Sequence, residues 1–223
     1  MKKTEYTREE MKLFHKMNSP QKIQDYLNSL PFNFEEGWGT CMSPRKVLEM
    51  GKADCLEGAI FAAVVLEFHG HKPLLLDLRS TKKPYDYDHV VAVFKQFDCF
   101  GAISKTNHGV LRYREPVYKT VRELVISFFH EYFLDNGKKT LREYSELLDL
   151  SKLKCDRARA KGVLRPADRT WRTSEKDIWQ VHEALDKIKH YPMLSKKQIK
   201  NLRKADKIEI TAGKLVEWKK SKN

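Results

Sequence analysis

Two residues in the first half of the chain have the chemistry of a nucleophile and its base. Cys55 follows the turn Gly51-Lys52-Ala53-Asp54 and opens an apolar run, which predicts a thiol at the start of a helix. Unpaired backbone N–H groups at a helix start favour the thiolate form of a cysteine. His89 heads the strand-like run 89–94. A thiol and an imidazole within reach of each other form a catalytic pair.

The elements that must position this pair can be predicted from caps and periodicity. Three short helices are expected at 7–17, 19–30 and 43–50. Gly51 ends the third of these, and Asp54 caps a helix over 55–68 that is apolar around most of its circumference. This helix is therefore expected to be buried. Strand-like runs follow at 73–78, 87–95 and 99–103. Their short connections predict an antiparallel meander.

The second half of the chain is expected to be mainly helical. The predicted elements are helices at 117–134, 140–147, 174–189 and 195–205, and a small hairpin from 208–210 and 214–218. High charge together with glycine and proline predicts a boundary between Cys155 and Trp171. We therefore expect a domain over residues 1–155 and a basic, mainly helical C-terminal extension over residues 156–223.

Four segments around the cysteine and the histidine resemble the transglutaminase-like superfamily, whose core is papain-like. These segments are Ser43–Leu48, Gly51–Cys55, Gly70–Pro73 and Asp88–Val93. The resemblance covers about residues 40–110. It implies an α+β fold in which a central Cys-bearing helix packs on an antiparallel sheet, here followed by the helical C-terminal extension.

The resemblance also implies roles for individual residues. Cys55 would be the nucleophile and His89 the general base. The third member of such sites is an aspartate that ends the following strand, and Ser104 stands at that point in this sequence. A serine hydroxyl can orient the imidazole, but it stabilises the imidazolium less than a carboxylate does. Asn107 or Asp86 could take the place of Ser104.

The implied reaction is attack by the Cys55 sulfur on a carbonyl carbon. The thioester formed would be resolved by water or by an amine. The backbone N–H of Cys55 would stabilise the oxyanion, with the indole N–H of Trp38 as a second donor. We therefore expect a thiol-dependent hydrolase of peptide-like amides or an acyl transferase, with hydrolysis favoured, a peptide or protein substrate, and neither a metal nor an organic cofactor. The four cysteines are scattered and match no zinc or disulfide spacing.

A noncatalytic binding module with a basic interaction face is the alternative, and the serine at position 104 supports it. The net charge of +13 would suit an anionic partner, although a solubilising surface is favoured over nucleic-acid binding. Four basic residues after the strands could select an anionic substrate or form a solvated face: Arg112, Arg114, Lys119 and Arg122. No signal peptide or membrane span is expected, which predicts a cytoplasmic protein without membrane insertion and leaves its oligomeric state open.

Overall fold

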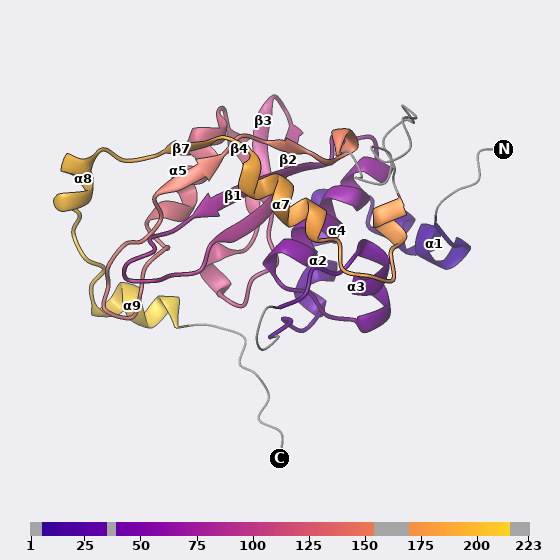
Figure 1. Cartoon of the computed structure of the whole chain (residues 1–223), viewed down its shortest axis with the longest axis horizontal. Helices are drawn as coiled ribbons and strands as arrows, with labels where there is room; N and C mark the ends of the chain where they lie inside the picture. The colour runs from indigo at the N-terminus through magenta and orange to yellow at the C-terminus, as the bar shows by residue number, and fades with distance from the viewer. Residues whose placement is uncertain (1–5, 35–38, 154–169, 215–223) are drawn as a thin grey trace, which may run out of the picture.

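The computed structural model describes residues 6–34, 39–153 and 170–214, and an antiparallel sheet forms its centre (Figure 1). Within these residues the sheet has seven strands in the order β4-β3-β2-β1-β5-β7, and β6 also pairs with β1. The strands are β1 Leu74–Arg79, β2 His89–Gln96, β3 Cys99–Ile103, β4 Arg114–Tyr118, β5 Glu143–Ser145, β6 Leu148–Asp149 and β7 His190–Pro192. Together with the helices described below, this arrangement confirms the α+β class.

The predicted meander is confirmed, and its register brings the ends of two strands together. β1 pairs with β2 and β2 with β3, all antiparallel. Ala92 of β2 lies opposite Ile103, the last residue of β3. The beginning of β2, where His89 stands, is therefore close to the first residue after β3, which is Ser104.

The first half of the chain supplies the helices that the caps predicted. They are α1 Arg8–Lys16, α2 Pro20–Ser29, α3 Pro44–Met50 and α4 Cys55–Phe68. The side chains of Thr7, Ser19, Ser43 and Asp54 each accept a backbone N–H at the start of their helix. Gly51 ends α3 in the left-handed conformation, with φ at 61°, as expected for a glycine in this position.

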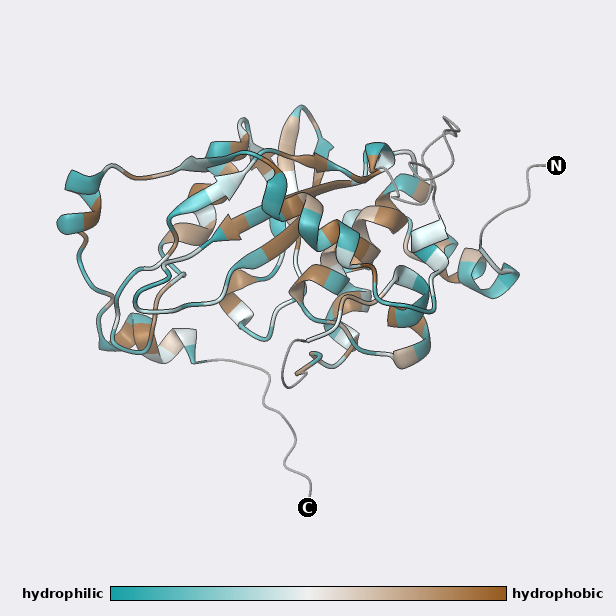
Figure 2. Ribbon diagram, viewed as in Figure 1, coloured by the Kyte–Doolittle hydropathy of each residue, from teal (hydrophilic) through white to brown (hydrophobic). Residues whose placement is uncertain are grey.

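Helix α4 lies on one face of the sheet and is buried from Leu56 to Leu66. It packs with α1, α2 and α3 against Leu75, Ala92 and Phe94. The opposite face of the sheet, which includes Leu76, Val91 and Val93, packs against α5 (Val121–Phe129). Because side chains alternate along a strand, β1 and β2 serve both layers and are apolar throughout much of their length (Figure 2).

Two predictions for the segment after β3 were wrong. Residues 140–147, expected to be helical, contain β5, because this segment pairs with β1 on one side and β7 on the other. Tertiary pairing of this kind overrides local helical preference. The helix expected at 117–134 is the shorter α5, and β4 occupies the residues before it.

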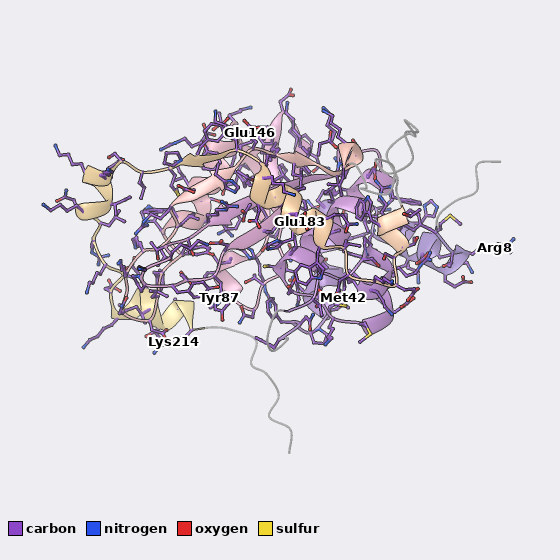
Figure 3. All side chains as sticks on the ribbon, viewed as in Figure 1. Arg8, Met42, Tyr87, Glu146, Glu183 and Lys214 are labelled. Carbon is purple, nitrogen blue, oxygen red and sulfur yellow. The ribbon has the colours of Figure 1, made fainter. Side chains whose placement is uncertain are left out.

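The helices predicted at 174–189 and 195–205 are the shorter α7 Trp179–Lys187 and α8 Lys196–Lys200. A further helix, α9 Lys207–Gly213, was not predicted. Residues 208–210, predicted as a strand, lie in α9, because Asp206 and Glu209 form a capping box at its start. All but the first residue of the partner strand predicted at 214–218 falls outside the described residues. The side chains of α8 extend away from the rest of the molecule (Figure 3), so its lysines form a solvated surface.

Residues after the predicted boundary contribute to the same sheet and core as those before it. β7 joins the sheet through β5, and Trp171, Ile178, Val181 and Leu185 belong to the core around α4. Most of the boundary segment itself lies outside the described residues. Within the described ranges, no helix combines the length and the apolar character needed to cross a membrane.

Candidate active site

Cys55 is the first residue of α4, and a capping box fixes this end of the helix. The Asp54 carboxylate accepts the backbone N–H of Glu57 at 2.8 Å, and the Glu57 carboxylate accepts the backbone N–H of Asp54 at 2.9 Å. Cys55 itself is partly exposed. The sequence prediction of a thiol at a capped helix start is therefore confirmed.

Glu57 is a buried carboxylate that the sequence reasoning missed as a determinant of this site. Besides Asp54, it accepts hydrogen bonds from the Asn33 side chain, the Thr40 hydroxyl and the Met42 backbone N–H, at 3.1, 2.6 and 3.0 Å. These bonds draw the segments before and after residues 35–38 to the start of α4. The spacing of Asp54 and Glu57 is that of a capping box, which is the sequence signal that could have identified this residue.

His89 and Ser104 are joined directly. The Nε2 atom of His89 lies 2.7 Å from the Oγ atom of Ser104, and the two residues are only 6% and 1% exposed. Ser104 thus occupies the place expected for the third member of the site. With Nε2 bonded to Ser104, Nδ1 is the ring nitrogen available to another group.

Two cavities meet at Cys55. The larger has a volume of about 500 Å³ and is lined by Cys55, His89 and several aromatic residues, including Phe32, Tyr87 and Tyr132. The smaller, of about 250 Å³, is also lined by Cys55 and lies toward Trp179 of α7. A substrate in the larger cavity would therefore have access to both the thiol and the imidazole side of the site.

Cys55 and His89 both line the larger cavity, and no hydrogen bond joins these two described residues. The backbone amide of Val90, which follows His89, is close enough to influence the titration of the Cys55 thiol. Catalytic hydrogen bonds are often long before substrate binds, so this arrangement is compatible with a nucleophile and its base.

The electrostatics of the pair contradict the expected thiolate. Burial raises the pKa of the Cys55 thiol to about 12, with the Asp54 carboxylate acting in the same direction and the backbone amides of Val90 and Leu56 opposing it. Burial also lowers the pKa of His89 to about 3, an effect increased by His108 and Arg114. The free site therefore holds a neutral thiol beside a neutral imidazole, because the influence of the helix start is weaker than desolvation.

The supporting residues considered from sequence do not replace Ser104. Asp86 and Asn107 both line the larger cavity. Asp86 accepts a hydrogen bond from the Thr140 hydroxyl at 2.5 Å, and neither residue is a hydrogen-bond partner of the His89 ring. Trp38, predicted as a second oxyanion donor, lies outside the described residues.

Carboxylates are the charged side chains that line both cavities. The larger cavity is lined by the carboxylates of Asp54, Asp86, Asp88 and Glu131. The smaller is lined by those of Asp54, Asp77, Asp88 and Asp186. Among the described residues that line either cavity there is no lysine or arginine. Four of these carboxylates are nevertheless paired with cations outside the lining: Glu131 with Arg114, Asp88 with Lys82, and Asp77 and Asp186 with Arg79.

The basic residues considered for selection of an anionic substrate do not line either cavity. Arg114 pairs with Glu131 at 2.7 Å and its guanidinium lies over the Phe128 ring. Arg122 donates to the Met193 carbonyl, and Lys119 is exposed. The cavity linings thus give no support to the alternative in which these residues select an anionic substrate, and the solvated face remains the favoured interpretation.

No set of three or more histidine, cysteine or acidic side chains in the described part of the chain is arranged to hold a metal ion. Comparison of the sequence with protein-family models and with curated proteins found no match.

Proposed function

We propose that the protein is a thiol-dependent hydrolase of peptide-like amides, or an acyl transferase, of the transglutaminase-like type. The observation that supports this proposal best is the 2.7 Å hydrogen bond between Ser104 and His89, a residue that lines the same cavity as Cys55. A nucleophile, a base and a residue that orients the base are the parts required for acyl transfer through a thioester.

The reaction follows from the neutral resting pair. The Cys55 sulfur attacks the substrate carbonyl carbon while its proton passes to Nδ1 of His89, and Nε2–H of the imidazolium donates to the Ser104 hydroxyl. The backbone N–H of Cys55, at the first position of α4, donates to the oxyanion. Collapse of the intermediate breaks the C–N bond, the leaving amine takes the proton from His89, and water or another amine then cleaves the thioester.

The resting pair is neutral because burial opposes the charged form of each group. Proton transfer from Cys55 to His89 therefore accompanies attack on the carbonyl carbon and does not precede it.

The lining of the cavities supports a neutral or cationic substrate rather than an acidic one. Carboxylates surround Cys55 without a lysine or arginine among the described lining residues, and aromatic rings of the larger cavity can contact apolar groups or cations. Because the described lining has no basic side chain to receive a carboxylate, a peptide with lysine next to the scissile amide should be preferred over one with glutamate.

The test is turnover of matched peptide libraries whose members differ only in lysine, alanine or glutamate beside the reacting amide. We expect cleavage or transfer that is lost in Cys55→Ala, with kcat/KM for lysine peptides at least tenfold above that for glutamate peptides. Turnover that persists in Cys55→Ala would refute the thiol mechanism. A preference for glutamate peptides with Cys55-dependent turnover would refute only the proposed substrate charge.

The second candidate function is a binding module that has this fold but performs no chemistry. It is favoured by the raised pKa of Cys55 and by the neutral partner of His89. Peptide binding by the wild type that is unchanged in Cys55→Ala, without any turned-over product, would support this alternative.

A further inference from the structure

Ser104 is held by a residue far from it in sequence. It follows the last residue of β3 and is 1% exposed, so its backbone N–H and C=O groups need partners other than water. Both partners come from the side-chain amide of Gln24 in α2. The backbone N–H of Ser104 donates to Oε1 of Gln24 at 2.9 Å, and Nε2 of Gln24 donates to the Ser104 carbonyl at 2.8 Å.

The orientation of the Gln24 amide is itself fixed. Nε2 also donates to Oδ1 of Asn28 at 2.9 Å, one turn further along α2. The amide nitrogen thus faces two acceptors and the amide oxygen faces one donor, which is the only assignment that satisfies all three contacts. Gln24 is 4% exposed, so these bonds are shielded from competing water.

The residue after Ser104 is anchored to the same helices. Lys105 donates from Nζ to the Leu30 carbonyl at the end of α2, at 2.5 Å. Its Cβ atom lies so close to Gly58 of α4 that a Cβ added at Gly58 would be 2.3 Å from it. The segment after β3 therefore has little room to move between α2 and α4.

We propose that Gln24 is a positioning residue of the active site. Gln24 binds both backbone groups of Ser104. It thereby holds the Ser104 hydroxyl at hydrogen-bond distance from Nε2 of His89. The Nδ1 atom of His89 is then directed to the proton of Cys55. Gln24 touches neither the substrate nor the reacting atoms, and this role rests on the proposed thiol chemistry.

The test is a double-mutant cycle on Gln24→Leu and Ser104→Ala, with p-nitrophenyl acetate as the acyl donor. If Gln24 acts through Ser104, each single variant lowers kcat about tenfold with KM changed less than twofold. The double variant is then no slower than the slower single variant. Asn28→Ala is the matched control, because it removes a hydrogen bond of Gln24 but leaves both contacts to Ser104; its kcat should stay within threefold of the wild type.

Gln24→Glu provides a second readout that does not depend on the leucine variant folding. Ionised glutamate accepts from the Ser104 N–H but cannot donate to the Ser104 carbonyl, whereas the protonated acid can do both. The ratio of variant to wild-type kcat should therefore rise as the pH is lowered. A ratio independent of pH would contradict the positioning role.

The outcomes separate this inference from the proposed function. Equal hydrolysis by the wild type and Cys55→Ala would overturn the thiol mechanism and the role of Gln24 with it. Two results would overturn the role of Gln24 alone while hydrolysis still depends on Cys55. One is a loss of kcat in the double variant that equals the product of the two single losses. The other is a wild-type kcat in Gln24→Leu.

Discussion

The pH dependence of Cys55 alkylation is the perturbation whose size follows most directly from the structure. Burial and the Asp54 carboxylate raise the pKa of this thiol to about 12, so at pH 7 about one molecule in 10⁵ carries the thiolate. An ordinary thiol with a pKa of about 8.5 is thiolate in about 3% of molecules. The greater nucleophilicity of a more basic thiolate recovers part of this difference. The expected net effect is alkylation about 100-fold slower than that of free cysteine.

The assay is timed reaction with iodoacetamide between pH 6 and pH 10, followed by peptide mass spectrometry that separates Cys55 from the other cysteines. We expect the Cys55 rate to rise about tenfold for each pH unit without a plateau. His89→Ala should leave the slope of this pH dependence unchanged, because His89 is uncharged in the resting site and does not hold a preformed thiolate. A fast reaction at pH 6 to 7 with a plateau, lost in His89→Ala, would show a preformed thiolate–imidazolium pair and refute the reasoning.

Three further predictions concern stability. Because His89 has a pKa of about 3 when folded and about 6.5 when unfolded, the unfolded chain binds its proton first, so the free energy of unfolding falls as the pH drops through this interval. Between pH 7 and pH 4.5, the free energy of unfolding measured by urea titration should fall by ~3 kcal/mol less in His89→Gln than in the wild type. Equal losses in both proteins would contradict this. Gly58→Ala should cost ~1–3 kcal/mol in the same assay, since the new Cβ overlaps Lys105; a change below ~0.5 kcal/mol would show that the segment can move. Glu57→Ala should cost ~3–5 kcal/mol, because it leaves buried donors around α4 without their acceptor, and unaltered stability would rule out its organising role.

The parts of the site that the sequence predicted are those set by local rules. Gly51 and Asp54 fix the end of α3 and the start of α4 through backbone conformation and capping, and both effects act within a few residues. Ser104 was named through the resemblance, which implies that the third residue follows the strand after that of His89. Its bond to His89 depends only on the register of β2 and β3.

The parts that the sequence did not predict depend on contacts between distant segments. The apolar pattern predicted that α4 is buried, but it did not show that desolvation and Asp54 would outweigh the field of the helix start and raise the pKa of Cys55. The segment 140–147 is a strand because β1 and β7 lie on either side of it. Gln24 looks like an ordinary polar residue of α2, and only the fold brings it to Ser104, 80 positions away.

The most direct test of the central claim is to trap the acyl-enzyme. The protein is mixed with p-nitrophenyl acetate, quenched in acid within milliseconds to seconds, and analysed by intact and peptide mass spectrometry. The account predicts one acetyl group on Cys55 whose formation is at least 100-fold slower in His89→Ala and absent in Cys55→Ala. Acetylation of other residues only, or of Cys55 at the same rate in His89→Ala, would contradict it.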